Sequence, residues 1–400
     1  MAGDRTRQAV EAALAATGQL AEAEGVSLVG RVFLPDAGGP AVVRVSGGRA
    51  SDISAAFPTV ADLCETTDPA AALREAAGRD LGPIAPILAN TPPDARDAGR
   101  PHLLAPVDFQ ALKAAGVTFV VSMLERVIEE KIRGDAEAAK GVRRTIEDLI
   151  GNDLRRLRPG SPEAARLKAA LIEAGAWSQY LEVGIGPDAE IFTKGQPLSA
   201  VGCGADIGVH PASTWNNPEP EIVLVVSSEG TVVGASLGND VNLRDVEGRS
   251  ALLLGKAKDN NGAAAIGPFI RLFDERFSLD DVRGAELSLT VDGPEGYRLE
   301  GRSSMAEISR DPADLAAQAI NAHHAYPDGL ALFLGTMFAP IQDRDEPGRG
   351  FTHKAGDVVT IATPALGALV NCVRPTDAVE GWWMGGRALM RNLKARGLLG

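Results

Sequence analysis

The chain contains few aromatic residues, few cysteines and no excess of positive charge. Aromatic residues make up 4% of the 400 residues, whereas glycine occurs 45 times and proline 25 times. This composition favours many short strands and turns over the packing of long helices. The three cysteines, Cys64, Cys203 and Cys372, form no CxxC pair. No disulfide framework is therefore predicted, and a reducing compartment such as the cytoplasm suits the chain best.

Two further absences narrow the classes of function. The formal net charge is −13 and no sustained basic run occurs, which argues against nucleic acid as a partner. The N-terminal residues Met-Ala-Gly-Asp-Arg contain no apolar signal core, and no apolar stretch reaches the ~18 residues that a membrane span needs. We therefore expect a soluble cytoplasmic protein without a membrane partner. The length allows two or three domains with a sizeable core.

The first quarter of the chain is predicted to form a helix followed by a small β-rich domain. Residues 1–25 have helical spacing and stop at Gly25, and the small domain is expected at 26–105. Within it the pattern indicates two strands at 28–34 and 41–45 and two short helices at 60–64 and 69–78. A Pro-rich linker is predicted at 84–105.

The remaining residues, 106–400, are predicted to form one larger domain. A charged helical insertion is expected at about 123–180, and strands dominate from residue 191 onwards. The expected strands are 201–209, 222–236, 286–291, 297–302 and 358–363, and a further strand is expected at 330–335. One helix is expected among them at 312–324, with Asp311 as its N-cap and Pro312 as its first residue.

The sequence Glu219-Pro220-Glu221 is the first candidate for a functional site. The two carboxylates are at i and i+2, so on an extended segment both point to the same face. Pro220 has no N–H group, which suits the start or edge of a strand. Burying such like charges is costly unless a cation or hydrogen bonds compensate. On its own, the pair is also compatible with a solvated strand edge.

A hairpin after this pair is expected to bring a third carboxylate to the same place. Two apolar strands, 222–228 and 231–236, are joined at Glu229-Gly230, and Asp240 follows the second strand. Asp240 can thus return to the end of the sheet where Glu219 and Glu221 lie. Three converging carboxylates would form an all-oxygen site for a hard divalent ion such as Mg²⁺.

Several short motifs, in this order, resemble the fumarylacetoacetate hydrolase superfamily from about residue 105 to the C-terminus. The first is the Glu-x-Glu pair followed by Asp240, and each motif gains weight from its place in the order. The others are Phe192-Thr-Lys194, the Gly-Lys-x-x-Asp stretch 255–259, Gly267-Pro268, Gly335-Thr336, Gly356-Asp357 and Asn371-Cys-Val373. The resemblance implies a mainly β fold with α-helices. In it, a small N-terminal α/β domain precedes a mixed β-sandwich roll that carries a helical lid or insertion.

The predicted lid departs from the hydrolase pattern of this family. Hydrolases carry Asn-Tyr-x-x-His-x-x-Glu there, and the His–Glu pair activates water for C–C cleavage. Residues 122–129 read Ser-Met-Leu-Glu-Arg-Val-Ile-Glu, so Arg126 replaces the histidine while Glu129 is retained. Arginine stays protonated and cannot act as a base near neutral pH. Arg126 and Glu129 therefore either contact substrate or form an ordinary i,i+3 surface ion pair.

With Arg126 in place of the histidine and Glu190 in the segment Asp-Ala-Glu-Ile-Phe, the sequence resembles the dehydratase branch of the superfamily. That branch acts on 2-keto-3-deoxy-pentonates. Those enzymes remove water from the D-arabinonate or D-xylonate type of substrate and form 2-oxoglutarate semialdehyde in pentose catabolism. The resemblance implies Mg²⁺ or Mn²⁺ held by Glu219, Glu221 and Asp240, and enolate formation at C3 followed by loss of the C4 hydroxyl. It implies catalytic roles for Glu190 as base, Lys258 and Thr336. It implies substrate contacts for Arg126, Glu129, Lys194, Arg244 and Gly335.

Alternatives to these assignments remain open. An alternative role for Lys258 is that of a structural partner of Asp240 or Asp259. The alternative for Thr336 is an ordinary turn residue. Two alternative functions are Mg²⁺-dependent C–C hydrolysis of acylpyruvates or diketo acids, and ligand binding without catalysis. Family members usually assemble, so the resemblance further implies a homo-oligomer, either a dimer or a tetramer.

Overall fold

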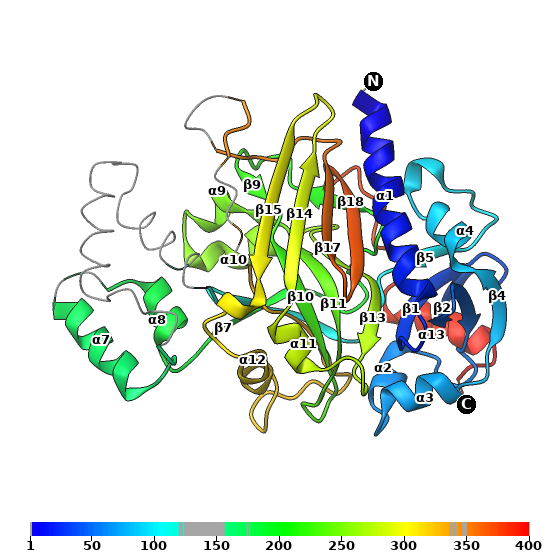
Figure 1. The fold of residues 1–400 in the computed structure, drawn as a ribbon, viewed down its shortest axis with the longest axis horizontal. Coiled ribbons are helices and arrows are strands. Elements are labelled where there is room, and N and C mark those ends of the chain that lie inside the picture. Colours follow the sequence, from blue (N-terminus) through cyan, green and yellow to red (C-terminus); the bar gives the residue numbers. More distant parts are fainter. Residues whose placement is uncertain are drawn as a thin grey trace.

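The computed structural model describes residues 2–119, 123, 157–173, 175, 177–336, 338, 342–345 and 350–399. Within these residues the strands form an 11-stranded sheet, a 5-stranded sheet and a 2-stranded pair (Figure 1). The expected fold, mainly β with a small N-terminal part of α and β, is present. Among the same residues, no helix is both long enough and apolar enough to cross a membrane.

The 11-stranded sheet has the order β4-β3-β2-β1-β13-β11-β10-β16-β6-β7, and β5 also pairs with β1. Its strands are β1 (Leu28–Leu34), β2 (Gly39–Ser46), β3 (Arg49–Asp52), β4 (Arg79–Pro83), β5 (His102–Leu104), β6 (Ala111–Gly116), β7 (Glu190–Gly195), β10 (Pro220–Val226), β11 (Val232–Asp240), β13 (Ala264–Leu272) and β16 (Leu330–Phe333). β1 pairs with β13, so this sheet continues across the predicted boundary at residue 105 instead of ending there.

The 5-stranded sheet has the order β15-β14-β17-β18-β8, and the 2-stranded pair joins β9 to β12. These strands are β8 (Asp206–Val209), β9 (Asn216–Asn217), β12 (Asn242–Leu243), β14 (Glu286–Asp292), β15 (Arg298–Ser304), β17 (Val358–Thr363) and β18 (Gly367–Pro375). The strand predicted over 201–209 begins only at Asp206. Gly202 abuts the backbone of Leu104 and Gly204 has φ +85°, so the chain bends before β8 starts.

The α-helices of the described residues are short, apart from the first. They are α1 (Ala2–Glu22), α2 (Val60–Cys64), α3 (Pro69–Glu75), α4 (Ile84–Ala89), α7 (Pro162–Glu173), α8 (Gln179–Ile185), α9 (Arg244–Glu247), α10 (Leu254–Lys258), α11 (Leu279–Arg283), α12 (Pro312–Ala319) and α13 (Gly386–Ala395). α1 lies against the 5-stranded sheet (Figure 1), where the Thr17 hydroxyl donates a hydrogen bond of 2.9 Å to the Ala368 carbonyl.

The linker predicted at 84–105 is wrong. This stretch contains helix α4, and its last residues form β5, which pairs with β1. Asn90 fixes the turn between them, because its amide Nδ2 donates to the carbonyls of Asp97, Arg100 and Pro101, each at 3.1 Å. The proline-rich stretch thus contains a hydrogen-bonded turn between α4 and β5 and is not a linker between domains.

The start of α12 follows the prediction, whereas its end does not. The Asp311 side chain accepts a hydrogen bond from the Ala313 N–H at 2.8 Å, and Pro312 is the first helical residue. The predicted helix to residue 324 stops at Ala319. Just beyond it, the Asn321 side chain accepts from the His323 N–H, and such a local turn competes with continuation of a helix.

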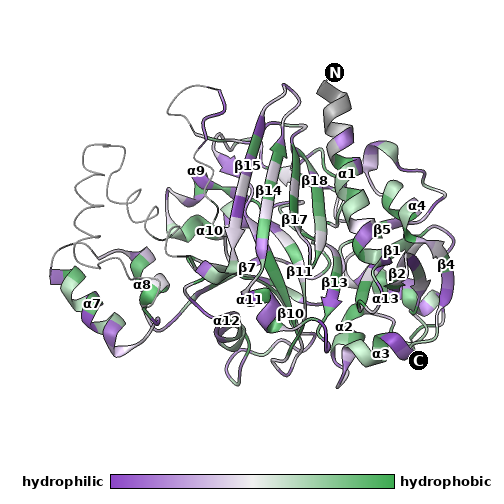
Figure 2. Cartoon of the chain, in the orientation of Figure 1, coloured by the Kyte–Doolittle hydropathy of each residue, from purple (hydrophilic) through white to green (hydrophobic). Residues whose placement is uncertain are grey.

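Strand β10 shows how the 11-stranded sheet is buried on both faces. Ile222 and Leu224 belong to the core that also contains Leu289 and Ile361 of the 5-stranded sheet. Val223 lies on the other face, in a cluster with residues of α2 and α3. Successive strand residues point to opposite faces, so a strand buried on both faces needs a continuous apolar run. β10 and β18 are accordingly coloured mainly hydrophobic in Figure 2.

Helices α7 and α8 stand apart from the two large sheets (Figure 1). They share a small apolar cluster in which Met123, Leu171, Leu181 and Ile185 are buried. α7 lies within the insertion predicted over about 123–180, whereas α8 begins at its predicted end and continues to Ile185. Arg126 and Glu129 lie outside the described residues, so their predicted contact with substrate stays a prediction.

Candidate functional site

The β10–β11 hairpin brings three carboxylates to one end of the 11-stranded sheet, as predicted. The two strands are antiparallel, Pro220 is the first residue of β10, and the Asp240 N–H donates to the Glu219 carbonyl at 3.0 Å. One side-chain oxygen from each of Glu219, Glu221 and Asp240 lies within 4.8 Å of the others, and all three residues are buried. We call these three residues the carboxylate triad.

Two lysines form ion pairs with the triad. The Lys258 ammonium lies 2.5 Å from Glu219 Oε2 and 2.9 Å from Asp240 Oδ2, and Lys194 Nζ lies 2.8 Å from Asp240 Oδ1. Burial opposes the charge on Lys258, but Asp240 and Glu219 outweigh it and hold its pKa above the ordinary value. Burial of Asp240 is likewise outweighed by the two lysines, so the pKa of Asp240 is lowered.

Glu221 is the member of the triad that lacks a lysine partner of this kind. Its Oε2 accepts a hydrogen bond of 2.6 Å from the Gly335 N–H. Burial, followed by the charges of Asp240 and Glu219, raises the pKa of Glu221 well above its ordinary value. The site thus places three carboxylates against two ammonium groups in a region of low dielectric. Such an oxygen-rich, negatively charged donor set fits a hard divalent cation, and the triad could bind one.

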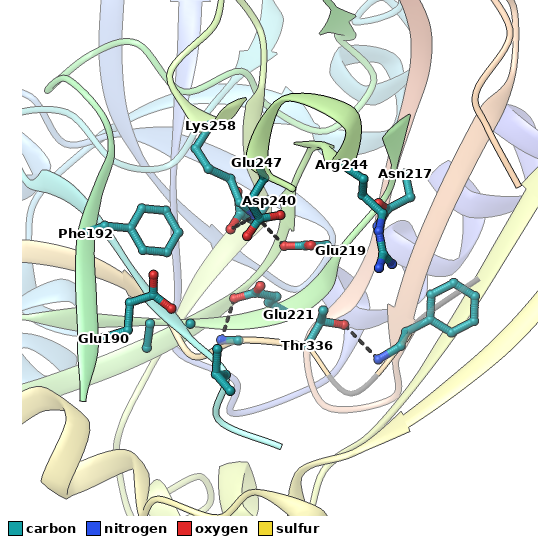
Figure 3. Close-up of a pocket in the computed structure, with 15 residues that line it drawn as sticks. Glu190, Phe192, Asn217, Glu219, Glu221, Asp240, Arg244, Glu247, Lys258 and Thr336 are labelled. Carbon is teal, nitrogen blue, oxygen red and sulfur yellow. Dashed lines mark hydrogen bonds and ion pairs between the residues drawn. The ribbon is translucent and has the colours of Figure 1, made fainter. Parts of the chain in front are cut away.

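A cavity opens over the triad (Figure 3). Besides the triad, its walls contain Ala115, Gly116, Val117, Glu190, Phe192, Asn217, Arg244, Glu247, Lys258, Gly335, Thr336 and Phe338. Glu190, the first residue of β7, directs its carboxylate into this space (Figure 3). The cavity therefore contains a carboxylate outside the triad, as a separate acid–base group would require.

The segment after β16 forms one wall of the cavity. The Thr118 hydroxyl donates to the Leu334 carbonyl at 2.7 Å, and this contact holds the segment beside β6. Gly335 has φ +89°, and a β-carbon there would lie 2.1 Å from the Thr118 hydroxyl. Its N–H is directed at Glu221, so the contact that the structure shows is with the triad. The Thr336 hydroxyl accepts from the Phe338 N–H at 3.0 Å and lines the cavity.

The prediction that Lys194 contacts substrate needs correction. Its side chain has no exposed surface, and its ammonium donates to the carbonyls of Lys258 and Val241 at 2.5 and 3.1 Å besides pairing with Asp240. Burial, and then the charge of Lys258, lowers the pKa of Lys194. Lys194 lies behind Asp240 and orients that carboxylate instead of facing the cavity.

Arg244 lies where a substrate-binding residue should be. It is the first residue of α9, it lines the cavity, and it is 8% exposed. Its guanidinium carbon lies 4.7 Å from the centre of the Trp215 ring, a cation–π arrangement that fixes the side chain. The substrate contact itself stays a prediction.

Several residues in or beside the cavity escaped the sequence analysis. The Asn242 amide donates to Glu219 Oε1 at 2.8 Å and to Glu247 Oε2 at 2.6 Å, so it orients a member of the triad. Asn217 Oδ1 is buried and has no hydrogen-bond partner among the described residues. The position of Asn242 two residues after Asp240, on the same face of an extended segment, is a signal that could have indicated it. No local signal indicated Asn217 or Gly116.

Comparisons with known proteins relate this chain to a family and to individual enzymes. Residues 168–374 match the family model described as fumarylacetoacetate (FAA) hydrolase C-terminal. The chain is 29% identical over 201 residues to a probable 2-keto-3-deoxyxylonate dehydratase of Haloferax volcanii, which covers 50% of this chain and 65% of that protein. It is 30% identical over 185 residues to the 2-dehydro-3-deoxy-D-arabinonate dehydratase of Saccharolobus solfataricus, which covers 46% and 58%. The matches thus span less than two thirds of either relative.

A solved structure shares the fold. It is 2-keto-3-deoxy-D-arabinonate dehydratase complexed with magnesium and 2,5-dioxopentanoate, and it superposes with a TM-score of 0.59. The comparison covers 87% of this chain and 99% of that one at 20% identity. At this identity the likeness supports the fold alone, and it confirms the fold that the motifs implied.

Proposed function

The chain belongs to the fumarylacetoacetate hydrolase family, and from that premise we propose that it is a Mg²⁺-dependent dehydratase of a 2-keto-3-deoxy-pentonate. The observation that carries the proposal is the buried carboxylate triad in a cavity that also holds the separate carboxylate of Glu190. The two curated relatives are named as dehydratases of such sugar acids, which supports the same reaction class. The product would be 2-oxoglutarate semialdehyde.

Glu219, Glu221 and Asp240 would hold the metal. When bound there, Mg²⁺ would supply Lewis-acid polarisation of the 2-keto group. Lys258 lies beside two of these carboxylates and lines the cavity, so its ammonium adds positive charge where the keto oxygen gains negative charge. Mn²⁺ has similar ligand preferences and is the expected substitute.

Glu190 is the proposed base that removes a proton from C3 of the substrate. The C4 hydroxyl then leaves with a proton as water, which gives a C3–C4 double bond. Proton transfer from C5 to C3 converts this into the C4–C5 enol, and loss of the enol hydroxyl proton with protonation at C4 yields the aldehyde. Glu190 comes from β7 at the edge of the 11-stranded sheet, whereas the triad comes from the inner strands β10 and β11, so the base and the proposed metal ligands are held by separate strands. Arg244 and Thr336, from other walls of the cavity, are the proposed contacts for the substrate's oxygen atoms.

The direct test is incubation of the protein with 2-keto-3-deoxy-arabinonate and 2-keto-3-deoxy-xylonate in the presence of Mg²⁺. Mass spectrometry should show loss of one water molecule, and a chelator should abolish that loss. An acylpyruvate measured in parallel reports C–C hydrolysis through loss of its ultraviolet absorbance. If the acylpyruvate is cleaved faster than any sugar acid is dehydrated, the proposed function is wrong. Binding of the sugar acids without turnover would also contradict it.

The role of Glu190 has its own test. Glu190→Gln keeps the shape of the side chain but cannot accept a proton, so kcat should fall by about 10² to 10⁴ with little change in KM. Exchange of the C3 hydrogens with deuterated water, followed by NMR, separates proton removal from substrate positioning. A variant that exchanges these hydrogens at the wild-type rate must use another base. The homo-oligomer implied by the resemblance stays a prediction, which sedimentation velocity would test.

A further inference from the structure

The Glu190 carboxylate lies directly against the backbone of Gly116. The two residues are the last pair of the antiparallel strands β6 and β7. A β-carbon on Gly116 would lie 2.0 Å from Glu190 Oε2, 2.7 Å from Cδ and 3.3 Å from Cγ. Real contacts of a β-carbon are never as short as the first of these. The carboxylate therefore occupies the space that any other side chain at position 116 would fill.

The backbone conformation does not itself demand a glycine at this position. Gly116 is absent from the described residues that have positive φ, and it is the last residue of strand β6. Glycine weakens a strand, because it lacks a side chain that packs and it loses more conformational entropy on folding. A glycine within a strand marks a site where another group approaches closely. Here that group is the side chain of the proposed base.

The end of β6 also supports the opposite side of the cavity. Thr118 holds the Leu334 carbonyl, and the next residue, Gly335, donates its N–H to Glu221 of the triad. Residues 116–118 thus contact both the side chain of Glu190 and the segment that donates to Glu221. A group that displaces Glu190 from Gly116 moves it relative to the triad.

We propose that Gly116 is a positioning residue for Glu190, because the missing β-carbon leaves the space in which the base is held facing the triad. This inference rests on the proposed function, in which Glu190 removes the C3 proton. Gly116 itself contacts no reacting atom. Its predicted effect is on the rate of proton removal and not on the binding of the metal or the substrate.

The first variant is Gly116→Ala. Its added methyl group should displace the Glu190 carboxylate by more than an ångström and lower kcat by about 10²-fold, since misplacing a catalytic group by ~1 Å costs about that much. KM and the affinity for Mg²⁺ should stay close to wild type. The same fall should appear in the exchange of the C3 hydrogens of 2-oxobutyrate in deuterated water. That compound has C3 hydrogens and no hydroxyl to lose, so its exchange does not require dehydration.

A second substitution separates a displaced base from a damaged strand. Glu190→Asp shortens the side chain by one methylene, so its oxygens no longer need the space over Gly116. Glu190→Asp alone should be slow, but adding Gly116→Ala to it should lower kcat by less than about twofold. A strand damaged by Gly116→Ala would instead lose the same factor in both backgrounds, and that additive result would overturn the inference.

Gly39→Ala is the matched control. Gly39 is also a strand glycine without positive φ, and a β-carbon there would lie 2.4 Å from the side chain of Asn392, away from the cavity. Its melting temperature should fall about as much as that of Gly116→Ala, with kcat unchanged. Wild-type kcat and exchange in Gly116→Ala would refute the role of Gly116. A wild-type protein that exchanges 2-oxobutyrate but dehydrates no sugar acid would refute the proposed function and leave Gly116 testable by exchange.

Discussion

Asp357 and Glu221 are both buried carboxylates next to strands, and their surroundings have opposite charge balance. Both oxygens of Asp357 lie 2.6 Å from the guanidinium of Arg344. One of them also lies 3.1 Å from His353 Nδ1 and accepts from the Lys354 N–H at 2.9 Å. Glu221 has one backbone N–H and two neighbouring carboxylates. The first carboxylate has all the partners it needs, and the second is surrounded by like charge.

The pKa values of Asp357 and Glu221 are shifted in opposite directions, as this difference in charge balance predicts. Burial alone would raise both, but the hydrogen bonds from Arg344 and His353 outweigh it and lower the pKa of Asp357. Nothing outweighs it for Glu221, whose pKa is raised. Both residues belong to motifs that resemble the same family. A satisfied carboxylate indicates a structural role, whereas a buried excess of negative charge beside a cavity indicates a site for a cation.

The largest expected effect comes from removing Asp240, the member of the triad that pairs with both lysines. Asp240→Ala should lower kcat/KM by at least about 10³-fold, because the metal loses a ligand and its stabilisation of developing charge is worth several kcal/mol. Titration calorimetry should show loss of Mg²⁺ binding. Circular dichroism should still report a folded protein. An Asp240→Ala variant with wild-type activity in metal-free buffer would show that the triad is not a cation site needed for activity.

Asp357→Ala should show the reverse pattern. It leaves Arg344 buried without its main partner, so the free energy of unfolding should fall by about 3–5 kcal/mol in urea titrations. Mg²⁺ affinity should be unchanged, because Asp357 does not line the cavity. Glu295→Ala is the control, since Glu295 is a half-exposed partner of the same arginine and should cost less than about 1 kcal/mol. If the two variants cost the same, Asp357 is not the anchor of this cluster.

Lys194→Met tests whether the lysine behind the triad acts on the metal. The variant keeps an apolar side chain of similar length but removes the cation that orients Asp240. Mg²⁺ affinity measured by calorimetry should fall about 10- to 100-fold, as for other groups that orient metal ligands. Lys113→Met on the neighbouring strand is the control, because Lys113 contacts Thr193 at the surface. If the two substitutions give the same Mg²⁺ affinity, Lys194 does not position Asp240.

The smallest effect is on the pH dependence of stability without metal. Folded Glu221 keeps its proton at pH values where the unfolded chain has lost it. The melting temperature should therefore fall as pH rises from the ordinary value of 4.5 towards the raised pKa. Mg²⁺ needs the ionised form, so its affinity should rise over the same window. Glu221→Gln should flatten both profiles.

Asp357 should give a slope of the opposite sign in a lower window. Its pKa is lowered from 3.8, so its contribution to stability is present above that value and is lost as pH falls below it. Melting curves of Asp357→Asn and Glu221→Gln should therefore differ from wild type at opposite ends of the pH range. A wild-type melting temperature that is insensitive to pH between about 4.5 and 8 without metal would contradict the charge excess assigned to the triad.

The sequence by itself determined the elements whose causes are local. Glu219 and Glu221 share a face because strand residues alternate, and Asp240 returns to them because a short turn containing Gly230 joins two apolar strands. Gly230 has φ +81°, as such a turn requires. Asp311 starts α12 through a hydrogen bond within the first turn of the helix. Each of these follows from residues that are near one another in the chain.

Only the tertiary structure decided the rest of the site. Gly116 meets Glu190, Lys194 reaches behind Asp240, and Gly335 donates to Glu221, and each pair is far apart in the chain. The pairing of β1 with β13, which joins the two predicted domains in one sheet, is of the same kind. No local pattern encodes such contacts, because they depend on which strands become neighbours when the whole core packs. The triad was therefore predictable from one hairpin, whereas the groups that orient it and position its base required the fold.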